Sequence, residues 1–244
     1  MNYKAILQYE GTRYRGWQTQ GNTDNTIQGK LETLLTKMAG EPVEVNGSGR
    51  TDAGVHAAGQ VISFRCKTKE SPEEICRYMN EYLPEDIAVL SVEEAAPRFH
   101  ARLNAVRKTY VYRIWNAPVR NVFRRRFTTW IQKPLDLDAM EQAATLLCGT
   151  HDYRAFCSLK KFKKSTVRTI EKIEIGKMGQ EIRISYTGDG FLYHMVRILT
   201  GTLVEVGLGL RKPEEMTEIL EGQDRTKAGR LMPPEGLTLE SVEY

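Results

Sequence analysis

The order of strand and helix patterns along this chain predicts an α+β fold built from two similar α/β subdomains with largely antiparallel sheets. Two observations carry the prediction. A strand, helix, strand order appears in the first half of the sequence and returns in the second half without obvious sequence identity. The halves meet near residue 105, and no low-complexity linker separates them. We therefore expect an N-terminal subdomain over residues 1–105 and a C-terminal subdomain over residues 106–244, packed rigidly on each other.

The N-terminal half carries patterns for several strands and two helices. The first helix pattern begins at Asn25, which forms a capping-box pattern with Gln28 three residues later, and it ends before Gly40. The second begins at Ser71, with Pro72 at the first helical position. Strands are expected at residues 3–9, 43–46, 60–65 and 86–92.

The C-terminal half repeats this layout. A helix is expected over residues 138–147, where Gly149 ends the pattern, and a long apolar helix over residues 191–206. Pro213 opens a further short helix. Strands are expected at residues 109–115, 168–175, 181–187 and 238–244.

The composition describes an ordinary soluble protein with a mild excess of positive charge. Hydrophobic residues make up 41% of the 244 residues and charged residues 27%, and the net charge is +4. The distribution of the basic residues therefore matters more than their total. Any one cluster fits a solvated face as well as a phosphate contact, but several clusters in one chain favour a polyanionic partner. The clusters are Arg124, Arg125 and Arg126; Lys160, Lys161, Lys163 and Lys164; and Arg98, Arg102, Arg107 and Lys108.

The sequence argues against a metal site, disulfide bonds and a membrane-spanning segment. The four cysteines have no CxxC spacing, and the four histidines lie far apart without ligand-spaced companions. No apolar run approaches the roughly 18 residues that span a bilayer, and no signal-peptide pattern opens the chain. The sequence thus predicts a cytoplasmic protein with no metal and no membrane partner.

The most informative segment is residues 47–57, which read GSGRTDAGVHA and directly follow a strand pattern. Its glycines allow positive φ or a close approach to a ligand, and they bracket Arg50 and Asp52. A guanidinium two residues before a carboxylate favours the ionised carboxylate. The segment fits a loop that presents Asp52 to a ligand, and the alternative is a tight surface turn with an ion pair. It is not a Walker A loop, because no Gly-Lys-Ser/Thr follows.

The same segment closely resembles the signature GRTDAGVHA of the TruA family of tRNA pseudouridine synthases. Further matches follow in the family's order and cover nearly the whole chain; Ser48 stands where the family commonly has Ala. They are YRGWQTQ at residues 14–20, TIQ at 26–28, FHAR at 99–102, KTYVY at 108–112 and GFLYHMVR at 190–197.

The resemblance implies a pseudouridine-synthase-like core with the active-site cleft between the subdomains, and it implies roles for four residues. Asp52 is the nucleophile. Tyr110 stacks on uracil and offers its hydroxyl to the ribose or to proton transfer, where the alternative is a strand tyrosine in the core. Arg197 is a basic partner of Asp52, where the alternative is a snorkelling surface charge. Arg50 supports the loop, holds Asp52 ionised and helps to wedge the flipped base.

The resemblance also implies a homodimer that binds tRNA across both subunits and converts uridines 38 to 40 to pseudouridine. No cofactor is expected, because the isomerisation exchanges neither electrons nor phosphates. Whether Asp52 attacks the sugar C1′, attacks the base or assists elimination stays open. Phe191 and Met195, four apart, are expected to share a helix face near the pocket. The competing functions are a non-catalytic RNA-binding protein and a nucleotide-phosphate-binding enzyme.

Overall fold

The computed structural model describes residues 1–162 and 164–244, and the chain forms two compact units. Unit 1 comprises Met1–Val106 together with Thr238–Tyr244, and unit 2 comprises Arg107–Leu237. The last residues of the chain, which the sequence-based division leaves in the C-terminal half, thus pack with the N-terminal residues. The expected α+β class with mostly antiparallel strand pairing is confirmed.

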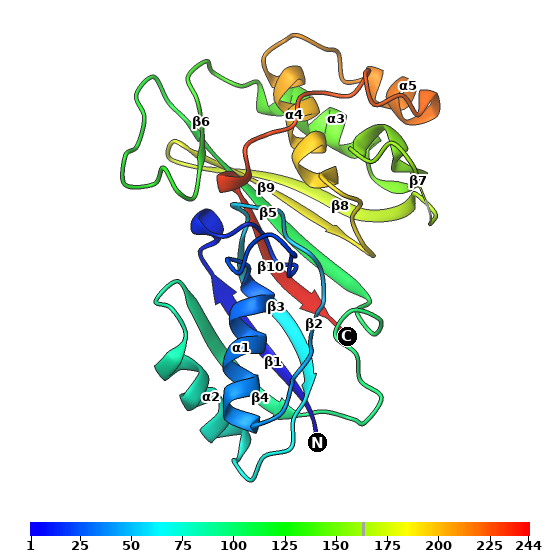
Figure 1. Cartoon of the computed structure of the whole chain (residues 1–244). Helices are drawn as coiled ribbons and strands as arrows, with labels where there is room; N and C mark the ends of the chain where they lie inside the picture. Colours follow the sequence, from blue (N-terminus) through cyan, green and yellow to red (C-terminus); the bar gives the residue numbers. More distant parts are fainter. Residues whose placement is uncertain (163) are drawn as a thin grey trace. The chain divides into compact units, whose positions relative to one another are not determined.

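The strands of unit 1 run in the order β4-β1-β3-β10, and β2 pairs with β3 (Figure 1). All of these pairs are antiparallel except β10 with β3, which is parallel. Every second side chain of β1 is buried, as the alternation of its sequence predicts. The strands are β1 (Asn2–Tyr9), β2 (Val45–Gly47), β3 (His56–Arg65), β4 (Ile87–Glu94) and β10 (Leu237–Glu243).

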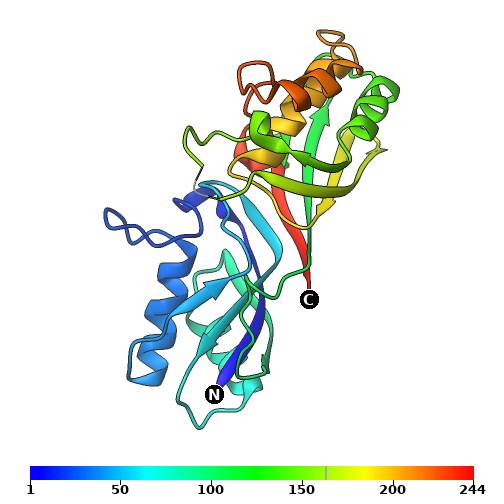
Figure 2. The same ribbon diagram turned by 90° about the vertical axis from the view of Figure 1, so that its right-hand side faces the viewer.

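The two helices of unit 1 are α1 (Ile27–Ala39), which runs beside β2, and α2 (Pro72–Tyr82), which packs on β4 (Figures 1 and 2). The predicted start of α2, with Pro72 at the first helical position, is confirmed. A capping box closes this end: Ser71 accepts from the backbone N–H of Glu74, whose side chain accepts from the backbone N–H of Ser71.

The N-cap predicted for α1 is wrong. Thr26, not Asn25, caps the helix by accepting from the backbone N–H of Gly29. The Asn25 side chain instead donates to the carbonyl of Arg13, in the short 3₁₀ helix η1 (Gly11–Arg13). Gln28 donates to the carbonyl of Val45, and its Oε1 accepts from the backbone N–H of Thr19 and not from that of the N-cap residue. The side chains that suggested a capping box therefore tie neighbouring segments to the helix.

The strands of unit 2 run in the order β5-β9-β8-β7, with β6 parallel to β5. The two shortest strands of this unit, β6 and β7, were not predicted; they have three and four residues and show little alternation. The strands are β5 (Arg107–Asn116), β6 (Thr129–Ile131), β7 (Gly149–Asp152), β8 (Val167–Met178) and β9 (Glu181–Gly188).

Three helices cover this sheet: α3 (Leu137–Leu146) packs on β8, α4 (Met195–Gly207) contacts α3 and β5, and α5 (Glu215–Gly222) contacts α3 and β7. Nearly every residue of α4 is buried. Unit 2 also has two 3₁₀ helices, η2 (Tyr153–Phe156) and η3 (Pro234–Gly236). No helix in the described residues is long and apolar enough to cross a membrane.

The predicted start of the long apolar helix is wrong by four residues. His194 has φ +66°, a left-handed conformation that an α-helix cannot contain, so α4 begins at Met195. Phe191 therefore precedes the helix, and it does not share a helix face with Met195. The residues before the true start are also apolar, so hydrophobicity alone did not mark the boundary.

Candidate active site

Asp52 lies half-buried in the turn that joins β2 to β3, which we call the Asp52 turn (residues 47–55). The backbone on both sides of Asp52 is fixed. The N–H of Trp17 donates to the carbonyl of Thr51 over 3.0 Å, and the N–H of Val55 donates to the carbonyl of Asp52 over 3.1 Å. Gly16, at φ +98°, lies so close that a Cβ there would be 2.9 Å from the Thr51 carbonyl oxygen. The turn is thus a close-packed structure and not a loose surface loop.

A buried polar network lies beneath this turn. Gln60 on β3 accepts from the Ser48 hydroxyl over 2.6 Å and donates to the Gly49 carbonyl over 2.9 Å. Its Nε2 also reaches the hydroxyl of Tyr9 on β1 at 3.4 Å, and that hydroxyl is 2.7 Å from the Thr51 Oγ1. Burial raises the pKa of Tyr9 to about 12, so its hydroxyl keeps its proton at neutral pH. Sequence reasoning missed this network, because its members come from three separate segments.

Arg50 behaves differently from the expectation that it holds Asp52 ionised. Its side chain is exposed and makes no hydrogen bond or ion pair with the residues that the structure describes. No direct contact with Arg50 therefore supports the carboxylate of Asp52. The guanidinium instead stands at the surface of the Asp52 turn, where an incoming ligand can meet it.

Tyr110 lies on β5 opposite Tyr186 of β9, and its side chain is buried. The ring of Phe191 meets it edge-on, with ring centroids 5.2 Å apart and planes at 82°. Two residues further along β5, Tyr112 donates to the carbonyl of Pro233 and also hydrogen-bonds to Thr129. Burial raises the pKa of Tyr112. The spacing of Tyr110 and Tyr112 in the sequence does not distinguish their roles. In the structure, the hydroxyl of Tyr112 is bound to other parts of the protein, so this side chain has a structural role.

Arg197, the third residue of α4, is only 8% exposed, so the alternative of a snorkelling surface charge does not apply. Its Nε donates to the carbonyl of Met232 over 2.7 Å, and the backbone N–H of Met232 donates back to the Arg197 carbonyl. The guanidinium plane is therefore fixed by a segment 35 residues away in the sequence.

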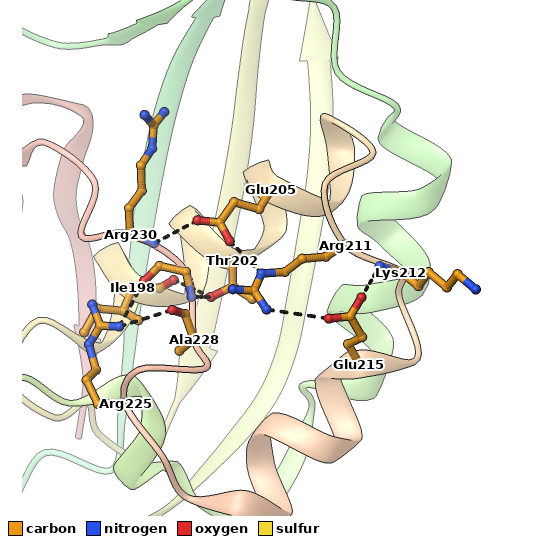
Figure 3. A network of polar contacts seen from close by, with 10 residues as sticks. Ile198, Thr202, Glu205, Arg211, Lys212, Glu215, Arg225, Ala228 and Arg230 are labelled. Atoms are coloured by element: carbon orange, nitrogen blue, oxygen red, sulfur yellow. Dashed lines mark hydrogen bonds and ion pairs between the residues drawn. The ribbon is translucent and has the colours of Figure 1, made fainter.

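Met232 belongs to a segment that we call the C-terminal strap (residues 224–236), which lies along α4 (Figure 3). The backbone N–H of Gly229 donates to Thr202, and that of Arg230 donates to Glu205. A Cβ on Gly201 would lie 1.9 Å from the Arg230 carbonyl oxygen, so the strap and the helix touch backbone to backbone. This packing holds the carbonyl that orients Arg197. A glycine inside an apolar helix, here Gly201, is the sequence feature that could have indicated this close backbone contact.

The arginine cluster divides into different environments. Arg124 and Arg183 each bind the buried carboxylate of Glu181, at 2.5 and 2.7 Å. Burial disfavours the charged carboxylate, but the hydrogen bonds from Arg183 and Arg124 outweigh it and lower the pKa of Glu181. Arg124 therefore holds the segment between β5 and β6 against β9. Arg125 and Arg126 are exposed.

Three of the four predicted lysines, Lys160, Lys161 and Lys164, are exposed in the segment between η2 and β8, which we call the lysine segment (residues 160–164). Lys163 lies outside the described residues. These three lysines place positive charge at the surface.

The part of the chain that the structure describes holds no group of three or more His, Cys, Asp or Glu that could bind a metal ion. Instead, individual histidines make protein contacts. Nδ1 of His56 accepts from the backbone N–H of Gly11 over 3.0 Å and lies 3.8 Å from Oε1 of Glu10. Nε2 of His151 lies 2.9 Å from the carbonyl of Cys148.

Comparisons with known proteins show which family this chain belongs to. The model of the tRNA pseudouridine synthase family matches residues 5–104 and 143–244, most of the chain. The tRNA pseudouridine synthase A of Bacillus sp. (strain KSM-64) is 48% identical over 243 residues, which cover 100% of this chain and 99% of that protein. The tRNA pseudouridine synthase A of Brevibacillus brevis is 46% identical over 241 residues, covering 99% and 98%.

Two further similarities are more distant. The tRNA pseudouridine synthase A 2 of Clostridium tetani is 42% identical over 244 residues, covering 100% of this chain and 98% of that protein. A chain in the crystal structure of a Cbf5-Nop10-Gar1 complex aligns with 83% of this chain and 45% of its own length, at a TM-score of 0.36 and 12% identity.

The family match defines the class first: this is an RNA-modifying enzyme, an isomerase. The chain belongs to the tRNA pseudouridine synthase family.

Proposed function

We propose that the enzyme converts uridine to pseudouridine at positions 38, 39 and 40 in the anticodon stem-loop of tRNAs, with Asp52 as the nucleophile. The observation that carries the proposal is the Asp52 turn, in which the backbone on both sides of one half-buried carboxylate is fixed. Such a carboxylate can form a covalent intermediate. The reaction breaks the N-glycosidic bond, rotates the base and rejoins it through carbon, so product and substrate have the same atoms and no redox cofactor is required.

Three further residues are assigned to substrate binding. Tyr110 presents an aromatic ring that can stack on uracil and a hydroxyl that can take part in proton transfer. Arg197 supplies a positive charge whose direction is set by Met232. Arg50 has an exposed guanidinium without a protein partner in the described residues, which suits an adaptable contact with the flipped nucleoside.

The RNA backbone is assigned to basic residues away from the target base. Phosphate contacts position a nucleic acid and do not depend on which base reacts. Arg124 suits this role less well than the other basic residues, because its guanidinium binds the buried carboxylate of Glu181. The assigned residues are Arg125, Arg126, Lys160, Lys161, Lys163 and Lys164, with Arg124 as a partial contributor.

We also propose that the protein works as a homodimer in the cytoplasm, where tRNA is modified. A set of large apolar side chains on the segment between β5 and β6 supports the dimer: Val119 is 75% exposed, Val122 58% and Phe123 93%. Apolar side chains gathered on one exposed segment are typical of an interaction surface. Sedimentation equilibrium of the wild type and of Phe123→Ser tests this proposal, and a wild-type monomer at micromolar concentration would contradict it.

The function is tested on unmodified tRNA transcripts that carry tritium at C5 of uridine. The wild type should release tritium from transcripts that have uridine at position 38, 39 or 40. It should release no tritium from a transcript in which cytidine occupies all three positions. Asp52→Ala should release none while still binding the tRNA. Release from the cytidine-substituted transcript would contradict the proposed positions, and binding by the wild type without any release would favour the non-catalytic RNA-binding alternative.

A further inference from the structure

Gln60 is the centre of the buried network beneath the Asp52 turn, and its bonds all lead toward the residues just before Asp52. The side chain is fully buried. Its amide oxygen accepts from the Ser48 hydroxyl, and its amide nitrogen donates to the Gly49 carbonyl. Through the hydroxyl of Tyr9 the same nitrogen is connected to Thr51. One amide thus bonds, directly or through one hydroxyl, to three of the four residues that lead into the nucleophile.

The chemistry of this position requires an amide. The nitrogen must donate to a backbone carbonyl, while the oxygen must accept from a hydroxyl. A carboxylate of the same size would place an acceptor against the Gly49 carbonyl oxygen, and an apolar side chain would leave the Ser48 and Gly49 groups without this partner. Neighbouring positions 61, 62 and 64 of β3 are buried and apolar, so burial alone does not explain a polar residue here.

A second buried polar residue on the same strand offers a comparison. Ser63 accepts from the backbone N–H of Ala101 over 3.0 Å and thereby holds the loop after β4. Gln60 and Ser63 are both buried on β3, and each binds the backbone of a loop. They differ in which loop they hold.

We propose that Gln60 is a positioning residue for the isomerisation: it fixes the backbone of residues 48–51 and thereby sets the direction in which Asp52 presents its carboxylate. The inference rests on the proposed role of Asp52 as the nucleophile. It gives the reaction a preorganised nucleophile, because the turn is held by the protein before tRNA binds.

The test compares Gln60→Met and Gln60→Glu with Ser63→Ala as the matched control. Single-turnover pseudouridine formation, the tRNA dissociation constant and the thermal midpoint are measured for each folded variant. Both Gln60 variants should lose roughly 10- to 100-fold in the single-turnover rate, because a displacement of about 1 Å at a reacting group has effects of this size. Their tRNA dissociation constants should stay within about twofold of the wild type, since phosphate contacts supply the binding. Ser63→Ala should lower the thermal midpoint and keep the wild-type rate.

Trp17 supplies a readout that reports on the turn directly, because its backbone N–H bonds to Thr51 and its indole lies against Gly47. In protein labelled with 5-fluorotryptophan, the resonance of Trp17 should shift in Gln60→Met and stay in place in Ser63→Ala. If Gln60→Met does not fold, Tyr9→Phe removes only the hydroxyl that reaches Thr51, and it should show a smaller loss of rate with the same shift.

The possible failures can be told apart. Activity in Asp52→Ala would overturn the proposed role of Asp52 and with it this inference. An inactive Asp52→Ala together with a wild-type rate in folded Gln60→Met would overturn the inference alone. An equal loss of rate in Ser63→Ala and Gln60→Met would also overturn it, because that result describes a general loss of stability.

Discussion

The sequence predicts a functional role for both the Asp52 turn and the lysine segment, but the two loops differ in how firmly the rest of the protein holds them. The turn is held by backbone hydrogen bonds, by the close approach of Gly16 and by the buried amide of Gln60. The lysine segment has three exposed side chains among its described residues. A reacting group needs a fixed direction, whereas charges that contact a flexible polyanion need only be near it. Under the proposed function, we therefore expect residues of the Asp52 turn to set the rate and residues of the lysine segment to set the affinity for tRNA.

The arginines of the candidate site repeat this contrast. Arg197 is buried and its Nε is bound to the carbonyl of Met232, while Arg50 is exposed and has no protein partner in the described residues. We expect Arg197 to keep its direction in the absence of substrate and Arg50 to become ordered only when tRNA binds. The sequence motifs assign both arginines to the site without distinguishing them. Their different burial becomes visible only in the structure.

The largest effect expected outside Asp52 itself is at Tyr110. If its hydroxyl takes part in proton transfer, Tyr110→Phe should reduce the single-turnover rate by about 100-fold or more with little change in tRNA affinity. Tyr112→Phe is the control, because that hydroxyl serves Pro233 and Thr129 within the core. A wild-type rate in Tyr110→Phe combined with a loss in Tyr110→Ala would mean that only the ring matters.

A smaller loss is expected at Arg197. Lysine keeps the charge but cannot both bind the Met232 carbonyl and present a planar fork, so Arg197→Lys should lower the rate by about 10- to 100-fold. Arg183→Lys, which alters an arginine paired with Glu181 in the same unit, should retain full activity. Rate measurements at saturating tRNA decide the matter, and equal rates for the two variants would contradict the positioning role of Met232.

The lysine segment should change affinity and not rate. In Lys160→Gln/Lys161→Gln/Lys164→Gln, KM should rise, the rate at saturation should be spared, and the salt dependence of binding should flatten by up to about 0.7 per lost contact. The matched control replaces the same number of lysines in unit 1: Lys30→Gln/Lys67→Gln/Lys69→Gln. Binding titrations at several salt concentrations provide the measurement. An unchanged slope in the first variant would remove the segment from the RNA-binding surface.

The smallest effect concerns Glu181 and stability at low pH. Its folded pKa is lowered because the hydrogen bonds from Arg183 and Arg124 outweigh the opposing effect of burial, so the stabilisation is present above the unfolded pKa and is lost as the pH falls through the folded value. Glu181→Gln should cost roughly 1 kcal/mol at pH 7 and weaken the acid dependence of unfolding. Urea unfolding at pH 7 and pH 4 tests this, and an identical pH dependence in both proteins would contradict it.

Features encoded in neighbouring residues were predictable, and features that depend on distant contacts were not. The start of α2 was predicted correctly because Ser71 and Pro72, which mark it, are adjacent in the sequence. The start of α4 was not, because the left-handed backbone of His194 depends on its surroundings, where Nδ1 lies 2.9 Å from the Ser158 Oγ.

The candidate site shows the same division. The motif alone identified Asp52, since the order of residues in the turn is local. Gln60 and Met232 were not foreseen, because their roles appear only when β3 is placed under the turn and the strap along α4. Local patterns were thus enough to propose Asp52 as the reacting group, and tertiary packing was needed to propose which residues orient it.

The most direct test of the account is to measure two quantities on Asp52→Asn: the single-turnover rate and the tRNA dissociation constant. Asparagine keeps the size of the side chain and removes its nucleophilic carboxylate. We expect no detectable pseudouridine and a dissociation constant within about twofold of the wild type, because the charged segments proposed to bind RNA are unchanged. Turnover above a few per cent of the wild-type rate, or a loss of tRNA binding of more than about tenfold, would contradict the separation of chemistry from binding.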